Sequence, residues 1–312
     1  MTVASRTLRL GTRRSALALA QAGRVAADLR AQGHEVALVE VVTEGDRSAA
    51  ALTALGGTGV FVTELRRRLA DGAIDVAVHS LKDLPTAPAP GLVVAAVPTR
   101  EDPRDALVSR DRTLLTQLAR GATVGTGSPR RAAQLRAMGL GLDVVPLRGN
   151  VDTRLRRVAE GDLDAVVVAA AGLTRLGRLD EAAELLDPGQ MLPAPGQGAL
   201  AVECRADDES LVDVVRRALD DPATRAAVSA ERVLLEVLEA GCTAPVGALA
   251  DIAVGDSGED EIYLRGAVTA PDGSRAVRLS ITGPIAEGDR LGRQLAGDLL
   301  DAGAAALIGE SS

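Results

Sequence analysis

Arginine side chains stand at the predicted starts of several helices, within four residues of a Ser or Asn that favours a helix N-cap. A helix N-terminus carries partial positive charge, so an arginine there is unfavourable by roughly 0.3–1 kcal/mol unless an anion binds beside it. Guanidinium groups and unpaired backbone N–H groups together bind carboxylates and phosphates. The pattern therefore indicates anion binding, although an arginine-rich chain could also scatter these residues over solvated surfaces. The set is Arg13, Arg14, Arg130, Arg131 and Arg154.

A second candidate site follows a predicted strand that ends near residue 78. Ser80, Lys82 and Asp83 lie within four residues, in the segment His79-Ser-Leu-Lys-Asp-Leu-Pro85. The carboxyl edge of a parallel sheet is where open α/β folds bind ligands, so an adjacent ammonium and carboxylate there could form a reactive centre. An ordinary polar loop would have the same composition, and local sequence does not separate the two interpretations.

Cys242 lies in the segment Glu239-Ala-Gly-Cys242, which is predicted to be a loop. An accessible thiol on such a loop could attach a group covalently. A lone cysteine is also often a small buried apolar side chain, and we retain that interpretation for Cys204, which lies in an apolar segment.

Two stretches of alternating strand and helix signals must position these residues. The alternation predicts two α/β units with parallel sheets and covering helices, and Arg148 at a strand end faces the ligand-binding edge of the second. A third, α+β region follows, with two helices, three strands and a last helix over about 287–307. The expected domains are residues 1–99 with 197–217, residues 103–193, and residues 218–312.

Composition narrows the class of protein. The net charge is −8, and the chain has one Phe, one Tyr and no Trp, so we expect neither a global basic field nor aromatic platforms for nucleic acid. No run of 18 apolar residues and no signal-peptide pattern is present, so we expect a cytoplasmic protein that does not bind a membrane. Two histidines and two cysteines leave little for a metal site, and we expect no metal. Nothing in the sequence demands more than a monomer.

With these pieces assembled, the chain resembles the porphobilinogen deaminase family, also called hydroxymethylbilane synthase. The resemblance covers nearly the whole length. Seven ordered motifs carry it: Leu10-Gly-Thr-Arg-Arg-Ser15, His79-Ser-Leu-Lys-Asp-Leu-Pro85, Gly125-Thr-Gly-Ser-Pro-Arg-Arg131, Leu147-Arg-Gly-Asn-Val-Asp-Thr-Arg154, Ala171-Gly-Leu-Thr-Arg-Leu-Gly177, Pro195-Gly-Gln-Gly-Ala199 and Glu239-Ala-Gly-Cys242.

The resemblance implies an α/β fold with two domains of the periplasmic-binding-protein type and a smaller C-terminal α+β domain. It implies a transferase of tetrapyrrole (haem) biosynthesis that joins four porphobilinogen molecules head to tail, with loss of ammonia, into hydroxymethylbilane. The implied cofactor is a dipyrromethane primer held by a thioether to Cys242. Porphobilinogen carries an acetate and a propionate, so the growing chain is a polyanion that many arginines could bind.

The resemblance also implies roles for individual residues. Asp83 matches the catalytic carboxylate, which would assist loss of the amine and stabilise the cationic intermediates. The residues that match cofactor-binding positions are Ser80, Lys82, Thr126, Ser128, Arg130, Arg131 and Arg148. Those that match substrate-binding positions are Arg13, Arg14, Ser15, Phe61, Arg154, Arg175 and Gln197.

One segment departs from the family pattern. The Gly-rich stretch 46–59 matches a lid in which many relatives carry lysines, whereas this chain has Ala54 and Thr58 there. Two other functions stay open on sequence alone. The chain could be a non-enzymatic binder of small organic anions, or a decayed paralogue that keeps the fold, against which Asp83 and Cys242 both argue.

Overall fold

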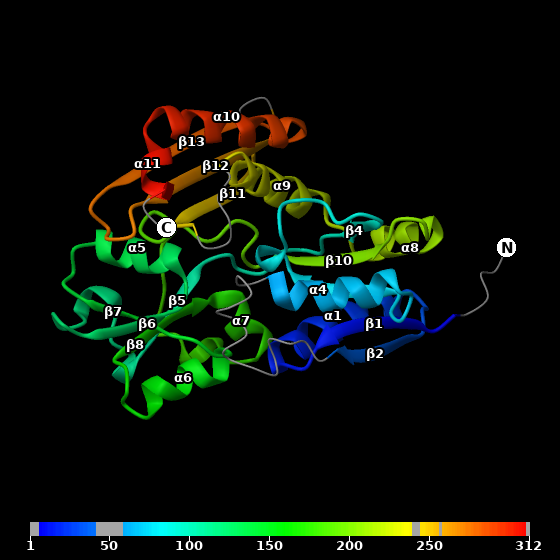
Figure 1. Cartoon of the computed structure of the whole chain (residues 1–312), viewed down its shortest axis with the longest axis horizontal. Helices are drawn as coiled ribbons and strands as arrows, with labels where there is room; N and C mark the ends of the chain where they lie inside the picture. The colour runs from blue at the N-terminus through cyan, green and yellow to red at the C-terminus, as the bar shows by residue number, and fades with distance from the viewer. Residues whose placement is uncertain (1–5, 42–58, 239–243, 256–257, 310–312) are drawn as a thin grey trace. The chain divides into compact units, whose positions relative to one another are not determined.

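The computed structural model describes residues 6–41, 59–238, 244–255 and 258–309. The chain forms two compact units (Figure 1). The first unit comprises residues 1–100 and 199–225, and the second unit comprises residues 101–198 and 226–312. Our expected division into three domains stays a prediction.

The first unit is built on a five-stranded sheet with the order β2-β1-β3-β10-β4. Its strands are β1 (Leu8–Arg13), β2 (Val36–Val41), β3 (Val76–Ser80), β4 (Leu92–Ala96) and β10 (Leu200–Arg205). β1 pairs in parallel with β2 and β3, as predicted, but β10 runs antiparallel to β3 and β4. The direction of β10 was not predicted. The returning chain enters at the carboxyl edge, where Leu200 pairs with Ser80, and therefore runs the opposite way.

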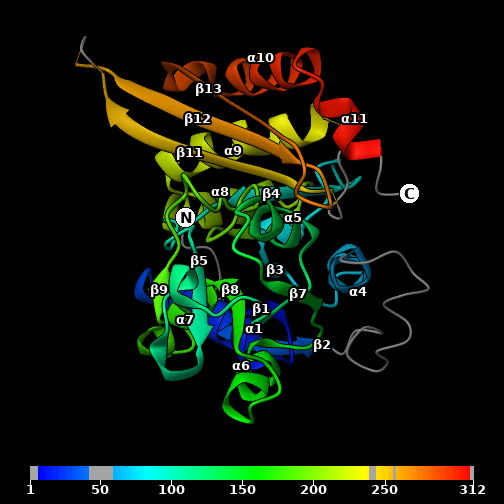
Figure 2. The same ribbon diagram turned by 90° about the vertical axis from the view of Figure 1, so that its left-hand side faces the viewer.

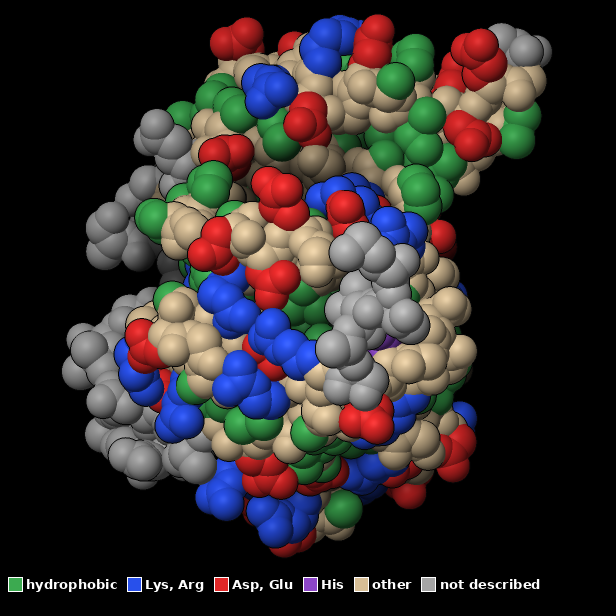
Figure 3. Space-filling view, turned by 90° about the vertical axis from the view of Figure 1, so that its right-hand side faces the viewer, with side chains coloured by type: hydrophobic (Ala, Val, Ile, Leu, Met, Phe, Trp, Pro, Cys, Tyr) green, Lys and Arg blue, Asp and Glu red, His purple; other side chains and the backbone are tan. Residues whose placement is uncertain are grey.

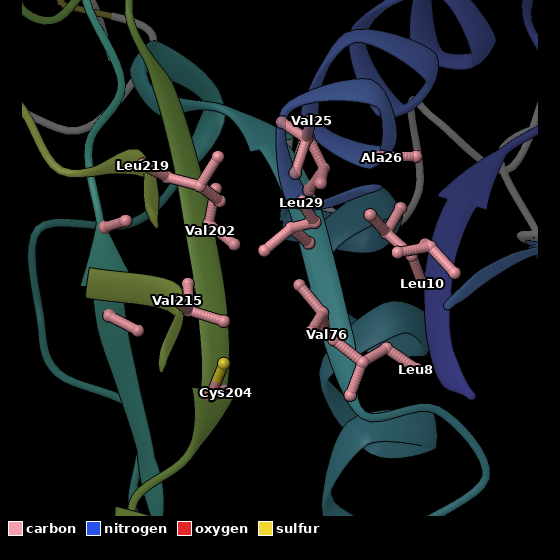
Figure 4. Close-up of a cluster of buried hydrophobic side chains, with 14 of the residues drawn as sticks. Leu8, Leu10, Val25, Ala26, Leu29, Val76, Val202, Cys204, Val215 and Leu219 are labelled. Carbon is pink, nitrogen blue, oxygen red and sulfur yellow. The ribbon is translucent and has the colours of Figure 1, made fainter. Parts of the chain in front are cut away.

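Helices cover both faces of this sheet. They are α1 (Ala16–Ala31), α4 (Gly59–Ala70) and α8 (Glu209–Leu219), with a 3-10 turn η1 (Leu81–Asp83) after β3. Apolar side chains of α1 and α8 pack with β1, β3 and β10 on one face, where Val25, Val202 and Val215 lie together (Figure 4). α4 packs on the other face against Ile74 and Ala77. Cys204 is fully buried in the first cluster, which confirms its interpretation as an apolar core residue.

The second unit contains a five-stranded sheet with the order β7-β6-β8-β5-β9. Its strands are β5 (Asp105–Ser109), β6 (Thr123–Thr126), β7 (Asp143–Pro146), β8 (Ala165–Ala169) and β9 (Glu184–Leu185). β6 is parallel to β7 and β8, and β5 is antiparallel to β8 and β9. α5 (Pro129–Ala137) covers one face, while α6 (Val151–Ala159) and α7 (Ala170–Arg175) cover the other. The short 3-10 turns of this sheet's loops are η2 (Arg110–Arg112), η3 (Leu115–Gln117) and η4 (Leu179–Glu181).

A three-stranded antiparallel sheet completes the second unit. Its strands, in the order β11-β12-β13, are β11 (Val246–Val254), β12 (Asp260–Thr269) and β13 (Ala276–Pro284). α9 (Pro222–Val237), α10 (Gly288–Asp301) and α11 (Ala304–Gly309) share one core with this sheet, and Figure 2 shows α10 lying along its strands. A 3-10 turn η5 (Ile285–Glu287) leads into α10. The single last helix predicted over 287–307 is wrong, because Gly303 takes a φ of +94° that ends α10 and lets α11 begin.

The predicted fold class is confirmed: the chain has two five-stranded α/β sheets of equivalent strand order and a smaller C-terminal α+β part. In each sheet three parallel strands are followed by one antiparallel strand, β10 in the first and β5 in the second. The carboxyl ends of the parallel strands therefore meet at one edge of each sheet. These two edges carry most of the predicted site residues.

Candidate functional site

The carboxyl edge of the first sheet brings together two of the predicted motifs. Arg13 ends β1, and Ser15 is the N-cap of α1, where its hydroxyl accepts a hydrogen bond from the N–H of Ala18 at 3.3 Å. Because β1 and β3 are neighbouring parallel strands, this cap lies at the same edge as the turn after β3. Arg14, by contrast, is exposed and forms an ion pair with Glu40, with Nε 3.0 Å from the carboxylate.

The turn η1 carries Lys82 and Asp83, both half-buried. Backbone hydrogen bonds hold it at both ends: the N–H of Leu81 donates to the Ala199 carbonyl at 3.0 Å, and the N–H of Leu84 donates to the Leu81 carbonyl at 3.1 Å. Leu81 and Leu84 are both buried. The turn is therefore fixed, and its two charged residues are partly open to solvent.

Ser80, the last residue of β3, connects this turn to α1. Its hydroxyl accepts a hydrogen bond from the side-chain amide of Gln21, at 3.0 Å. Gln21 is itself buried on α1. The predicted cofactor-binding hydroxyl of Ser80 therefore also joins the sheet to the helix that follows Arg13 and Ser15.

The carboxyl edge of the second sheet holds the remaining predicted residues of the α/β units. Thr126 ends β6, and Ser128 caps α5, accepting a hydrogen bond from the N–H of Arg131 at 3.4 Å. Asn150 caps α6 in the same way, accepting from the N–H of Thr153 at 2.9 Å. Both N-caps were predicted, and each places the arginines of its motif in the first turns of a helix.

Arg130 and Arg131 are buried and bind a carboxylate of their own chain. Arg130 Nη2 lies 2.8 Å from Asp105 Oδ2, while Arg131 Nε and Nη2 lie 3.0 and 2.8 Å from Asp105 Oδ1. Burial by itself would raise the pKa of Asp105, but the two guanidinium groups outweigh it and hold that pKa well below its usual range. These contacts give the two arginines a structural role, and their contact with a cofactor stays a prediction.

Gln197 completes this buried cluster. Its amide nitrogen donates to Asp105 Oδ1 at 2.7 Å and to the Pro103 carbonyl at 2.7 Å, and its oxygen accepts from Arg131 Nη2 at 3.3 Å. Gln197 is fully buried. It was expected at the substrate, and here it ties the segment before β5 to the segment that leads into β10.

Arg175, at the end of α7, binds the same crossing segment. Its Nη2 donates to the Gly198 carbonyl at 2.6 Å. Gly198 has a φ of +89°, and a Cβ there would lie 2.4 Å from the Glu101 carbonyl oxygen, so only glycine fits. Arg175 therefore supports a backbone turn, in addition to any contact with an anion.

Arg148 and Arg154 are the most accessible cations of this edge. Arg148 is exposed and makes no hydrogen bond or ion pair within the described residues. Arg154 is half-buried, and its Nε donates to the Gly149 carbonyl at 2.9 Å. Of the arginines at this edge, Arg148 thus has the donors most available to an external carboxylate.

Sequence reasoning missed Asp105, whose carboxylate organises the second edge. A usable signal was present: an acidic residue heads the apolar run Asp105-Ala-Leu-Val-Ser109, where a buried strand would need a partner for it. The identity of that partner depended on the tertiary structure.

Two predicted elements fall outside the described residues. Cys242 lies in the segment 239–243, and most of the expected lid lies in 42–58, neither of which the structure describes. Phe61 lies within α4, but only its backbone is described.

The face of the molecule drawn in Figure 3 carries charge of both signs. On the face drawn in Figure 3, Lys and Arg side chains are interspersed with Asp and Glu side chains. Among the described residues, no group of three or more His, Cys, Asp or Glu side chains could hold a metal ion. Within the same residues, no helix combines the length and the apolar composition needed to cross a membrane.

Comparison with known proteins decides the family. Residues 8–213 match the family described as "Porphobilinogen deaminase, dipyromethane cofactor binding domain", and residues 225–301 match "Porphobilinogen deaminase, C-terminal domain". The chain belongs to the porphobilinogen deaminase family. Porphobilinogen deaminase 1 of Streptomyces coelicolor is 57% identical over 98% of this chain and 98% of its own length. The porphobilinogen deaminase of Mycobacterium leprae is 57% identical over 96% of each chain.

Solved structures with similarity to the chain include a nutrient binding protein from Burkholderia cenocepacia bound to methionine. It has a TM-score of 0.44 and 14% identity, and the similarity covers 67% of this chain and 90% of that protein. Membership of the porphobilinogen deaminase family disfavours the alternative of a non-enzymatic anion binder.

The described residues fit the carboxylate-bearing dipyrromethane cofactor of this family. Arg130 Nε is buried and has no hydrogen-bond partner among the described residues. A buried donor without an acceptor costs about 1–3 kcal/mol, so this donor fits a site that is completed by an external acceptor. The exposed guanidinium of Arg148 adds a cation at the same carboxyl edge of the second sheet.

Proposed function

We propose that the chain is a transferase that joins four porphobilinogen molecules head to tail, releasing one ammonia at each addition. Water then cleaves the tetramer from its primer as hydroxymethylbilane. The observation that carries this proposal is the position of Asp83. In a member of this family, Asp83 stands beside Lys82 on a fixed turn at the carboxyl edge of a sheet, half-buried and accessible to a ligand. Family membership supports the reaction, and the turn supplies the carboxylate that the reaction needs.

Asp83 would act on the positive charge that develops when the substrate loses its amine. A carboxylate placed in advance stabilises such charge electrostatically. It can also carry a proton between the pyrrole carbon that loses one and the leaving amine that takes one up. The hydrogen bonds that fix η1 keep the carboxylate from reorganising during each addition. One residue can thereby serve four chemically equivalent steps.

The cationic side chains would hold the carboxylates of the cofactor and the growing product. In this proposal Lys82, Ser80, Thr126, Ser128, Arg130, Arg131 and Arg148 hold the cofactor. Arg13, Arg14, Ser15, Phe61, Arg154, Arg175 and Gln197 contact the substrate. The dipyrromethane, attached through Cys242, supplies the primer on which the product is built.

Arg148 is the side chain of this set whose availability the structure supports best, because it is exposed and makes no contact within the described part of the chain. Arg130 would contribute mainly through its unpaired Nε. Asp105 and the carbonyls of Leu192 and Val167 already accept from the other guanidinium donors of Arg130 and Arg131.

We further propose that the protein works as a monomer in the cytoplasm, with porphobilinogen as its substrate and without a nucleic-acid or membrane partner. The composition supports the absence of a nucleic-acid partner, since the net charge is −8 and aromatic residues make up 1% of the chain. The three-domain division at 1–99 with 197–217, 103–193 and 218–312 is part of the same proposal.

The covalent cofactor is testable by intact-mass spectrometry of the purified protein. The expected mass exceeds the sequence mass by one dipyrromethane, and Cys242→Ala is expected to lack the excess. Cys204→Ala is the matched control, because Cys204 is fully buried in the core and should leave the excess in place. Ammonia release from porphobilinogen tests the reaction. An active protein without added mass would overturn the cofactor assignment, and no ammonia release would overturn the reaction.

A further inference from the structure

A buried carboxylate on β10 joins two elements of the first unit. Glu203 is 2% exposed, and it makes a two-point ion pair with Arg66 of α4, with Nη2 2.7 Å from Oε1 and Nε 3.0 Å from Oε2. Its Oε2 also lies 3.1 Å from Nε2 of His79, which is buried too. The two-point contact with Arg66 occupies both oxygens of the carboxylate. His79 Nε2 lies in charge contact with Oε2 without the geometry of a hydrogen bond.

His79 is the residue of β3 that directly precedes Ser80 and the turn η1. Successive side chains of a strand point to opposite faces, so His79 faces α4, as Ala77 does, while Ser80 faces α1. The end of β3 is thus held from both faces: by Glu203 through His79 on one, and by Gln21 through Ser80 on the other.

Stability alone is a weak reason for such a cluster. Removing charges from water carries a desolvation penalty that often cancels their attraction, so well-packed apolar residues of similar volume commonly serve as well. Burial by itself would raise the pKa of Glu203, but the nearby His79 and the two hydrogen bonds from Arg66 outweigh it and lower that pKa to about 2. The carboxylate therefore stays charged at neutral pH, which keeps the contacts directional.

We propose that Glu203 is a positioning residue for the reaction: through His79 it fixes the end of β3, and so the turn that presents Lys82 and Asp83. The role in turnover rests on the proposed function, since Asp83 is the catalytic carboxylate of that proposal. The fixing of the turn does not depend on it. A small displacement of a catalytic group lowers a rate strongly, so loss of this contact would act on kcat more than on KM.

Asp75 provides a matched control within the same strand. It directly precedes β3 at the opposite edge of the sheet, it is fully buried, and its carboxylate also pairs with arginines. Arg9 Nη2 lies 2.9 Å and Arg205 Nη2 lies 3.3 Å from Asp75 Oδ1. Asp75 thus matches Glu203 in burial and pairing but lies at the edge without the predicted site residues.

The experiment compares Glu203→Gln with Asp75→Asn in the full-length protein by two measurements. The first is amide hydrogen exchange of Leu81 and Leu84, relative to the amides of β1, an interior strand of the same sheet. The second is steady-state turnover of porphobilinogen. For Glu203→Gln we expect Leu81 exchange to rise at least about tenfold and kcat to fall at least about tenfold, with KM within about twofold. For Asp75→Asn we expect the Leu81 exchange rate and kcat each to stay within about twofold of the wild-type values, even if the unfolding temperature falls.

Two outcomes would overturn the proposal. Unchanged exchange at Leu81 and Leu84 in Glu203→Gln would show that Glu203 does not fix the turn. Faster exchange with unchanged kcat would show that fixing the turn does not matter to the reaction. If the wild-type protein releases no ammonia from porphobilinogen, the proposed function fails, and the exchange comparison still decides whether Glu203 holds the turn.

Arg66→Lys gives a second route if Glu203→Gln does not fold. Lysine keeps the positive charge but cannot form the two-point contact with Glu203. We expect a smaller rise in Leu81 exchange, in the same direction, and a proportionate fall in kcat. A His79→Gln, Glu203→Gln double variant should lose no more kcat than the worse single variant, because both act through one contact. Additive losses would contradict a route through His79.

Discussion

The carboxyl edges of the two five-stranded sheets have the same topology, but the charged side chains of their motifs differ in burial. At the first edge, Lys82 and Asp83 stand half-buried on a turn, and the buried carboxylate of Glu203 lies behind it on the neighbouring strand. At the second edge, Arg130 and Arg131 are themselves buried, and Asp105 neutralises both. Equivalent strand order thus puts charged motifs in equivalent places without giving them equivalent availability.

The difference teaches that burial, rather than position at a strand end, separates charges that support the fold from charges that can meet a ligand. A buried guanidinium with a carboxylate partner has exchanged water for that partner, and a ligand would have to compete with it. An exposed guanidinium such as that of Arg148 has no such competitor among the described residues. Substitutions at the two edges should therefore divide into effects on turnover and effects on stability.

The largest expected effect is on turnover and comes from the first edge. Asp83→Asn removes the charge but keeps the size of the side chain, so kcat should fall about 10²–10⁴-fold, as for the loss of a positioned acid or base. The unfolding temperature should stay close to that of the wild type, because Asp83 is only half-buried. Asp213→Asn, on the exposed face of α8, is the control and should change neither quantity. Substantial turnover in Asp83→Asn would remove Asp83 from its role.

The second effect is on stability and comes from the second edge. Asp105→Asn leaves two buried guanidinium groups without a carboxylate, which should lower the free energy of unfolding by about 3–5 kcal/mol in urea titrations. Asp164→Asn is the matched control in the same unit, because its carboxylate is 41% exposed beside Arg110, and it should cost less than about 1 kcal/mol. Equal losses in both variants would contradict the contrast between buried and accessible charge.

Acid stability sharpens the comparison within the first unit. The pKa of Glu203 is lowered from 4.5 to about 2, so its contribution to stability is complete above pH 4.5 and is lost as the pH falls from 4.5 toward 2. Between pH 4.5 and pH 2, the unfolding free energy of Glu203→Gln should therefore fall by about 2–3 kcal/mol less than that of the wild type. The pKa of Glu64 is also lowered to about 2, by Arg67, but Glu64 lies at the surface. Glu64→Gln should change the same curve by less than about 0.5 kcal/mol, since water and salt screen that pair.

The smallest effect expected is on substrate or cofactor affinity. Arg148→Ala removes an exposed guanidinium and should weaken binding. The KM for porphobilinogen should rise, or the fraction of protein carrying cofactor should fall, by about tenfold, equivalent to about 1.4 kcal/mol. The unfolding free energy should change by less than about 0.5 kcal/mol. Arg156→Ala, an exposed arginine of α6, should change neither KM nor cofactor loading. Unchanged affinity in Arg148→Ala would contradict the assignment of available cations to the second edge.

The sequence by itself determined the local structure that places the motifs. Ser15, Ser128 and Asn150 were each predicted to cap a helix, and each accepts a hydrogen bond from a backbone N–H three residues later. β8 was predicted over its observed range from the apolar run Ala165-Val-Val-Val-Ala169. These signals are readable because both partners of each interaction lie within one turn of helix or one strand. The ordered motifs also gave the family, since they need no knowledge of contacts.

The tertiary structure alone decided which charges became structural. Asp105 meets Arg130 and Arg131 from 25 and 26 residues away, and Glu203 meets Arg66 from 137 residues away. The reversed strand β10, which brings Glu203 beside β3, depends on where the chain re-enters the sheet. Such pairs leave no local sequence pattern. Which charged side chains pair depends on their distance and on their desolvation in the folded protein, and both are set by the tertiary structure.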